Sequence, residues 1–94
     1  MIQSFKCKET AKIFNTGFSR KFPAKILKSS IIRLAMINRS GKLDDLKIPP
    51  SNHLEKLSED REGQYSIRIN DKYRVCFKWE DSSAFEVEIA DYHT

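Results

Sequence analysis

Hydrophobic and polar residues alternate along three runs in the second half of the chain. In residues 63–70 every second side chain is apolar, and the same period returns over residues 73–80 and 85–90. A period of two places apolar side chains on one face of a strand and polar ones on the other. Short stretches of turn-forming residues separate the runs. The pattern predicts an antiparallel meander of three strands.

The register of the first hairpin follows if the apolar faces of both strands point the same way. A one-residue slip would reverse every side chain, so a three-residue loop over residues 70–72 is favoured. Ile67 then lies opposite Val75, and Arg68 lies opposite Arg74 on the polar face. Applied to a second three-residue loop, residues 81–83, the argument sets two further pairs: Lys78 opposite Glu86, and Arg74 opposite Ala90.

Two arginines that face each other across a strand pair cost a few tenths of a kcal/mol up to ~1 kcal/mol. One interpretation is functional, because paired guanidinium groups match the oxygens of a phosphate. The other is that Glu88 or the loop carboxylates neutralise Arg68 and Arg74. The alternation alone leaves both interpretations open.

The first half of the chain predicts two helices. A short helix is expected over residues 9–16, ended by Gly17. Pro23 opens a second helix that starts at Ala24 and ends at Gly41. Its apolar stripe is predicted to hold the following residues: Leu27, Ile31, Leu34, Ala35 and Asn38, with Ile26 and Met36 on the flanks.

Two other segments are expected to be less regular. Residues 2–8 alternate loosely and predict a short edge strand. Residues 43–61 predict an irregular crossing, because the prolines of residues 48–52 suit neither a helix nor a central strand. The whole is an α+β fold, with two N-terminal helices packed on one face of a small antiparallel β-sheet and the arginine-bearing face left open.

Length and composition limit the number of domains, the class of partner and the cellular compartment. Ninety-four residues make one domain, residues 1–94. The formal net charge of +4 permits an acidic partner without requiring one. Lys28 and Arg33 on the second helix fit either a solvated surface or contact with phosphates. Cys7 and Cys76 suggest reduced thiols. With no apolar leader and no membrane-length segment, a cytoplasmic protein is expected.

A family resemblance is carried by four segments: residues 52–62, the strand 63–70, the strand 73–77, and the ending Val87-Glu88-Ile89-Ala90-Asp91-Tyr92-His93. Together they resemble a HigB-type toxin of the RelE superfamily. The opening residues 2–6 also fit, so the resemblance covers nearly the whole chain. It implies a RelE-like fold, similar to small microbial ribonucleases, and a toxin of a type II toxin–antitoxin system.

The resemblance also implies an activity and its partners. The expected activity is ribosome-dependent cleavage of messenger RNA, without metal or cofactor, by attack of the ribose 2′-hydroxyl on the adjacent phosphate. The expected partner is a HigA-like helix-turn-helix antitoxin, through which any contact with DNA would be indirect.

Such cleavage needs cations for the phosphorane charge, a base for the 2′-hydroxyl and an acid for the leaving oxygen. The candidate catalytic residues are two arginines and the C-terminal tripeptide: Arg68, Arg74, Asp91, Tyr92 and His93. Arg74 and Tyr92 share a face by alternation, and His93 has an ordinary pKa close to neutrality. Candidate RNA-binding residues are Lys28, Arg33, Lys56 and Arg61.

The chain departs from the family pattern at one place. The family usually reads Leu-Lys-Gly-Asp-Arg where this chain has Leu57-Ser58-Glu59-Asp60-Arg61. A cation is lost and an acid is gained, which puts the level of activity in question; Lys56 is a possible substitute. His53 fits a variable surface residue better than a second catalytic histidine.

Two alternatives share the fold. One is a ParE-like toxin that inhibits DNA gyrase by protein contact. The other is a degenerate toxin that only binds, with Ser58 and Glu59 as signs of lost activity. The nuclease interpretation needs Tyr92 and His93 near Arg74, and the sequence contains all three.

Overall fold

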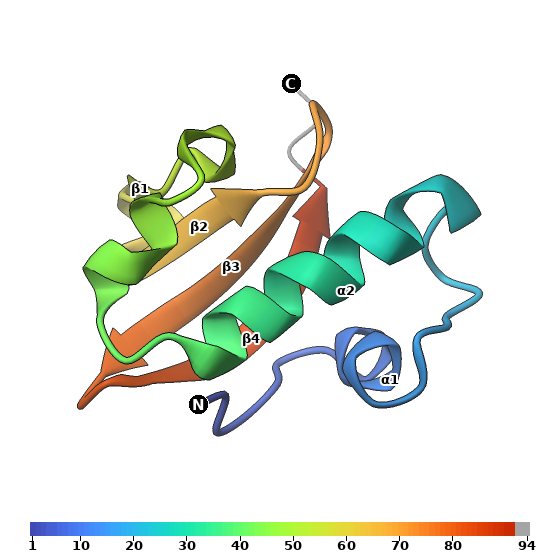
Figure 1. Ribbon diagram of the computed structural model, residues 1–94, viewed down its shortest axis with the longest axis horizontal. Coiled ribbons are helices and arrows are strands. Elements are labelled where there is room, and N and C mark those ends of the chain that lie inside the picture. The colour runs from blue at the N-terminus through green and yellow to red at the C-terminus, as the bar shows by residue number, and fades with distance from the viewer. Residues whose placement is uncertain (92–94) are drawn as a thin grey trace.

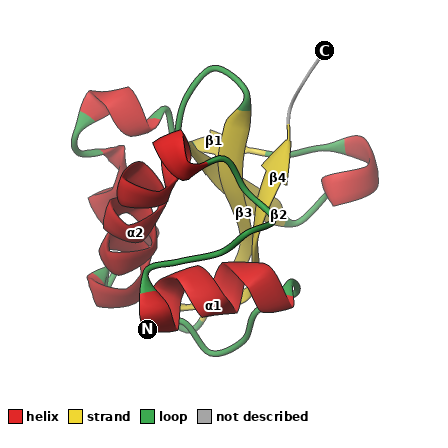
Figure 2. Ribbon diagram, turned by 90° about the vertical axis from the view of Figure 1, so that its right-hand side faces the viewer, coloured by secondary structure: helices red, strands yellow, loops and turns green. Residues whose placement is uncertain are grey.

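The computed structural model describes residues 1–91 and shows a helical layer against a four-stranded antiparallel sheet (Figure 1). The helices are α1, Lys8–Thr16, and α2, Ala24–Arg39. The strands are β1, Glu55–Lys56, β2, Gln64–Arg68, β3, Tyr73–Glu80, and β4, Ser83–Asp91, in the order β1-β2-β3-β4. The predicted α+β class is confirmed. Helix α2 crosses one face of the sheet, and α1 lies near the β4 edge (Figures 1 and 2).

Helix α1 begins one residue earlier than predicted and ends, as predicted, at Gly17. Gly17 takes the left-handed conformation, with φ of +78°, and donates its backbone N–H to the carbonyl of Ile13. A glycine meets this requirement without a Cβ penalty. The buried Thr10 accepts a hydrogen bond from the backbone N–H of Ile89 at 3.0 Å, which ties α1 to β4.

Helix α2 starts after Pro23 as predicted, but its buried face is rotated from the predicted stripe. The residues that it buries are Ile26, Ser30, Leu34 and Ile37. The predicted Ile31 is instead exposed, as is Ile32. The helix ends at Arg39, before Gly41, because Ser40 leaves the helical conformation and caps the carbonyl of Met36. No helix in residues 1–91 combines the length and the apolar character needed to cross a membrane.

The N-terminal segment lies beside β4 but is not a regular strand over residues 2–8. Two isolated parallel bridges, Ile2 to Ala84 and Phe5 to Val87, hold it at this edge. The prediction of an extended edge segment was therefore right in position and wrong in regularity, since α1 already begins at Lys8.

The segment predicted to be irregular contains short regular elements. Three 3₁₀ turns, Leu43–Lys47, Pro50–Asn52 and Glu59–Arg61, flank the two-residue β1. The prediction that the proline-rich stretch excludes a helix was wrong at Pro50–Asn52. Proline is tolerated in a first helical turn, where its missing N–H would have had no partner. This segment places β1 beside β2.

The first hairpin has the predicted register. Ile67 pairs with Val75, and Arg68 pairs with Arg74. Ile67, Val75 and Phe77 are fully buried against the helical layer. The core thus fixes the strand faces, and the two arginines are placed on the opposite face.

The second hairpin departs from the prediction. Its turn has two residues, Asp81 and Ser82, both with positive φ (+49° and +64°), which suits the right-handed twist of a hairpin. A bulge between Cys76 and Lys78 then shifts the register, and the φ of Glu86 is +51°. Lys78 therefore lies opposite Phe85 and not opposite Glu86 as predicted.

The bulge nevertheless restores the predicted pairing further along the strand, where Arg74 lies opposite Ala90. The predicted ion pair is also present, although the two residues are not directly opposite: the Lys78 ammonium lies 2.7 Å from the Glu86 carboxylate. Lys78 donates a hydrogen bond and adds its positive charge, which lowers the pKa of Glu86 below its ordinary value.

Candidate functional site

One face of the sheet points away from α2 and carries both arginines. We call it the arginine face; strand alternation assigns to it Ser66, Arg68, Arg74, Cys76, Glu88 and Ala90. Ser66 and Cys76 are fully buried and Ala90 is nearly so. The small residues of this face are therefore covered, and its charged side chains are the ones that could contact a ligand.

Arg74 is firmly positioned. Its Nε donates a hydrogen bond to Ser66 Oγ at 2.7 Å, and one terminal nitrogen donates to the carbonyl oxygen of His53 at 2.5 Å. The same nitrogen lies 3.9 Å from the carboxylate of Glu55, and only 12% of the Arg74 side chain is exposed. Arg74 is therefore oriented by β2 and by the segment that precedes β1.

Arg68 is more open. Its guanidinium pairs with Asp71, a loop carboxylate that is 96% exposed. Helix α2 contacts the same position from behind, since Arg33 Nε donates to the backbone carbonyl of Arg68 at 2.9 Å. Arg33 thus contacts the end of β2 through its own guanidinium.

The predicted neutralisation of the arginine pair is found in part. The loop carboxylate Asp71 pairs with Arg68, as one alternative required. Glu88 does not serve this role, because its carboxylate lies 3.0 Å from Arg61 and 3.6 Å from Lys6. Glu88 therefore brings Arg61 onto the arginine face.

The other candidates are spread more widely. Lys56 pairs with Tyr65, which places it on the core side of the sheet. Lys28 is exposed on α2, in the layer behind the sheet. Asp91 lies opposite Tyr73, so its register position is not on the arginine face, and its carboxylate is 3.7 Å from the ammonium of Lys72. Tyr92 and His93 lie outside the described residues.

Sequence patterns missed the residues that hold Arg74. Ser66 was visible as the polar position two residues before Arg68, a spacing that puts both on one face. The carbonyl of His53 and the carboxylate of Glu55 come from the irregular segment, whose path no periodicity predicts. Across residues 1–91, no three His, Cys, Asp or Glu side chains gather as a metal site, and Cys7 and Cys76 form no disulfide.

The arrangement is suited to binding a phosphodiester. Two guanidinium groups on neighbouring strands supply several N–H donors to one face of the sheet, and the bonds that such groups make to phosphate oxygens are strong and directional. A phosphate would have to replace only the exposed carboxylate of Asp71 to reach Arg68. Arg74 would stay oriented by Ser66 and the His53 carbonyl.

Comparison with known proteins assigns the chain to a family. Residues 3–93 match the model described as RelE-like toxin of type II toxin-antitoxin system HigB. The chain is 30% identical to Endoribonuclease HigB of Proteus vulgaris over 93 residues, 99% of this chain and 100% of that protein. It is 35% identical to Toxin HigB-1 of Vibrio cholerae over 65 residues, 69% of this chain and 68% of that one.

An uncharacterized protein of Haemophilus influenzae is 40% identical over 62 residues, which are 66% of this chain and 61% of that protein. The match therefore spans less than two thirds of that relative. Among solved structures, the YoeB-YefM complex of Staphylococcus aureus has a similar fold, with a TM-score of 0.61 at 19% identity. This likeness covers 100% of this chain and 99% of that one. The chain belongs to the HigB-like group of RelE-like toxins of type II toxin–antitoxin systems.

Proposed function

We propose that this toxin is a metal-independent endoribonuclease that cuts messenger RNA. The observation that supports it most directly is the pairing of Arg68 with Arg74 on the open face of the sheet. Its relative from Proteus vulgaris, similar along its whole length, is named an endoribonuclease. From the family resemblance we further propose that cleavage occurs on the ribosome and that a HigA-like antitoxin neutralises the toxin.

The proposed reaction is an internal transfer. A base takes the proton of the ribose 2′-hydroxyl, the 2′ oxygen forms a bond to phosphorus, and the bond from phosphorus to the 5′ oxygen breaks. The leaving oxygen receives a proton from an acid. The products are a 2′,3′-cyclic phosphate and a 5′-hydroxyl, and no water enters this step.

The proposed roles follow the chemistry of each side chain. Arg74 and Arg68 bind the non-bridging oxygens and stabilise the additional charge of the phosphorane. The proton transfers are assigned to the C-terminal Tyr92 and His93, and Asp91, whose register position is not on the arginine face, is assigned the role of orienting His93. Arg61, held on the arginine face by Glu88, is the remaining candidate for contact with the RNA backbone.

The positions of the other cations narrow the RNA-binding proposal. Lys56 is on the core side of the sheet and Lys28 is on α2, so neither adjoins the arginine pair. Arg33 acts through the backbone of Arg68 and is a positioning residue in this proposal. The carboxylates of Glu55 and Asp71 are neutralising partners that RNA would compete with.

The test is a cell-free translation reaction programmed with one messenger RNA. The wild-type chain should cut it and leave cyclic-phosphate ends, and Arg74→Ala should lower the rate by about 10²-fold or more. Lys47→Ala, at an exposed cation in the Leu43–Lys47 turn, is the matched control and should cut normally. The melting temperature of each variant separates loss of chemistry from loss of fold.

Three outcomes would overturn the proposal. Uncut RNA with inhibited DNA gyrase would favour the ParE-like alternative. Uncut RNA with no inhibition by a folded chain would favour a degenerate toxin. Cleavage that survives in a folded Arg74→Ala variant would remove the arginine pair from the mechanism.

A further inference from the structure

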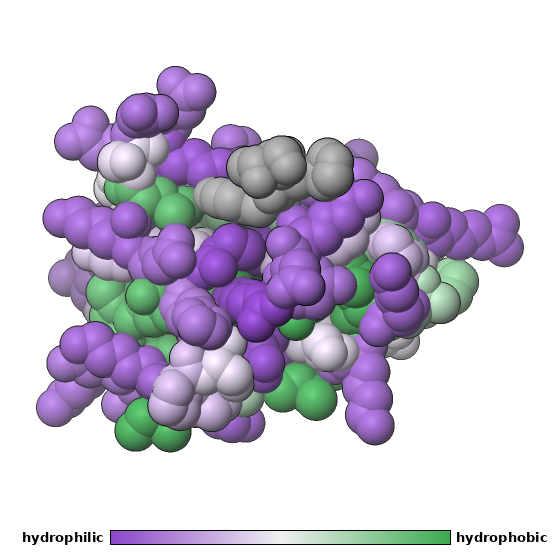
Figure 3. All heavy atoms as spheres, turned by 90° about the horizontal axis from the view of Figure 1, so that it is seen from above, coloured by the Kyte–Doolittle hydropathy of each residue, from purple (hydrophilic) through white to green (hydrophobic). Residues whose placement is uncertain are grey.

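The outward side of α2 is a mixed surface of cations and aliphatic side chains. We call it the outer α2 face; helical spacing assigns to it Lys25, Lys28, Ile31, Ile32, Ala35, Met36 and Arg39. Ile31 is 38% exposed and Ile32 43% exposed, although the core-facing side of the same helix is fully buried. Seen from above, the surface of the molecule is mostly hydrophilic, with hydrophobic patches between the hydrophilic side chains (Figure 3).

The charge of this region is one-sided. Residues 10–43 contain eight lysines and arginines and not one aspartate or glutamate, whereas the rest of the chain has more acids than bases. Within residues 1–91, Lys25, Lys28 and Arg39 make no ion pair or side-chain hydrogen bond. These cations therefore have no neutralising partner within the described chain.

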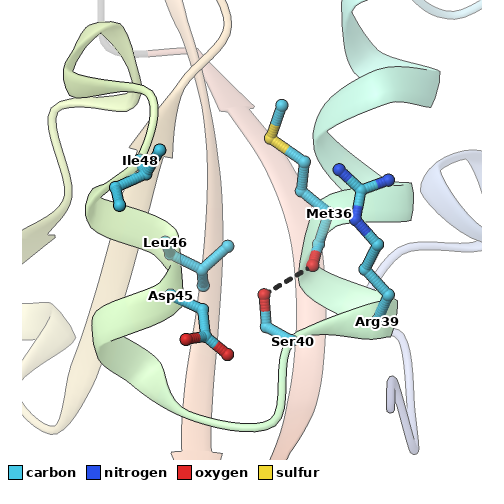
Figure 4. A pocket seen from close by; sticks show the side chains of 6 residues that line it. All are labelled: Met36, Arg39, Ser40, Asp45, Leu46 and Ile48. Atoms are coloured by element: carbon cyan, nitrogen blue, oxygen red, sulfur yellow. Dashed lines mark hydrogen bonds between the residues drawn. The ribbon is translucent and has the colours of Figure 1, made fainter.

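The outer α2 face leads into a pocket at its C-terminal end. The pocket has a volume of about 260 Å³ and lies between α2 and the Leu43–Lys47 turn. Met36 and Arg39 line it from the helix, and Leu46 and Ile48 line it from the facing segment (Figure 4). Ile48 is 75% exposed, so a partner that covered it would remove apolar surface from water.

The wall of the pocket is held in place from within. The buried Asn52 donates hydrogen bonds to the carbonyls of Leu46 and Ile48, at 3.1 and 3.4 Å. Asp45 is the acid at the pocket, but its carboxylate accepts the backbone N–H groups of Gly41 and Lys42. The pocket is thus lined by apolar and polar side chains alike; within residues 1–91 Arg39 makes no ion pair there, and the Asp45 carboxylate is bound by backbone N–H groups.

We propose that the outer α2 face and its terminal pocket form the docking site for a protein partner, whose binding segment carries both acidic and aliphatic side chains. The acids would lie against Lys25, Lys28 and Arg39. The aliphatic side chains would cover Ile31 and Ile32, and one would enter the pocket.

The aliphatic content decides between a protein and an RNA partner. RNA is bound through phosphates and through stacking of bases on aromatic or arginine side chains. Isoleucines do not stack on bases, and Ile31, Ile32 and Ile48 gain little from a phosphate backbone. Covering them with aliphatic side chains removes apolar surface from water.

The docking site is on the opposite side of the sheet from the arginine face. Binding there leaves Arg68 and Arg74 uncovered, so it is separable from the proposed cleavage. A variant of the outer α2 face should lose the partner and keep the nuclease rate.

The test is selection from a phage-displayed library of random 16-residue peptides against the whole chain. Enriched peptides should combine Asp or Glu with Leu, Ile or Val. For the best peptide, fluorescence anisotropy should show a Kd raised about ten-fold or more in the Ile32→Ser, Arg39→Glu double variant. Lys78→Glu, the same charge change on the other side of the sheet, should leave the Kd within about two-fold.

Amide NMR shifts of the wild-type chain give a second readout that does not depend on the double variant folding. The peptide should move signals in α2 and in residues 43–48. Peptides of another composition, no enrichment, or shifts confined to the sheet would overturn the proposal. So would tight binding of a 16-nucleotide RNA that needs Ile32 and Arg39, or self-association of the chain through this face in sedimentation.

Discussion

The arginine face and the outer α2 face are both rich in cations, but their cations are held differently. On the sheet, Arg74 has a hydroxyl, a carbonyl and a carboxylate as partners, and Arg68 has Asp71. On the helix, Lys28 and Arg39 make no ion pair or side-chain hydrogen bond within residues 1–91, and they lie among exposed isoleucines. Cations held by several partners suit chemistry on a small anion, whereas cations without a bonded partner, set between apolar side chains, suit an extended partner.

The largest expected difference between the two faces is in stability. Arg74→Ala should lower the free energy of unfolding by about 1–3 kcal/mol, because it removes charged hydrogen bonds from a nearly buried site. Relief of repulsion from Arg68 returns no more than ~1 kcal/mol of this loss. Arg39→Ala should change the same quantity by less than about 0.5 kcal/mol. Urea unfolding of both variants is the measurement.

If Arg74→Ala and Arg39→Ala changed the free energy of unfolding by the same amount, the two faces would not differ in how their cations are held. A cost at Arg39 as large as that at Arg74 would mean that the helix cation is also structural. Arg68→Ala is a second control on the sheet, because its exposed pairing with Asp71 predicts a change in the free energy of unfolding near zero.

The arginine pair could be predicted because alternation and a shared apolar face fix a register. Arg68 opposite Arg74 needed only the positions of Ile67 and Val75. The second hairpin could not be predicted in the same way. The two-residue turn shifts the register by one residue, and the bulge at Glu86 shifts it back further along β4. Neither feature can be recognised from the alternation of apolar and polar residues.

The outer α2 face was missed for a related reason. A hydrophobic stripe through Ile31 fits helical spacing, and nothing in the pattern tells a core isoleucine from an exposed one. The structure buries Ser30 and exposes Ile31 and Ile32. An isoleucine that lies outside the core can be identified only once the buried face of the helix is known.

The second prediction concerns the segment that carries Arg61 to the arginine face. Glu59 stands where the family usually has glycine, and its φ is +56°. The left-handed conformation costs a residue with a Cβ roughly 1–2 kcal/mol, and the greater entropy of glycine in the unfolded chain offsets about 0.4–1 kcal/mol of the gain from removing that cost. Glu59→Gly should therefore stabilise the chain by about 0.5–1 kcal/mol.

Glu62→Gly is the control in the same loop. Its φ of −54° is one that any residue adopts, so glycine should only add unfolded-state entropy and destabilise the chain. Thermal unfolding compares the two variants. If Glu59→Gly lowers the melting temperature as Glu62→Gly does, the strained backbone at Glu59 is not a feature of the folded chain.

The smallest expected effect is near the β3–β4 turn, where Lys78 pairs with Glu86. Lys78 lowers the pKa of Glu86 by its hydrogen bond and its charge. A carboxyl group whose pKa is lower in the folded state stabilises the fold above its unfolded pKa, and this contribution is lost as the pH falls through the folded pKa. Glu86→Gln should therefore lower the melting temperature slightly near neutral pH and not at all in strong acid, where Glu86 is protonated in both states.

Glu80→Gln, which removes an exposed carboxylate without an ion pair in residues 1–91, should show no such pH dependence. A deficit in Glu86→Gln that persists in strong acid would mean that Glu86 acts through the bulge and its backbone, and not through Lys78.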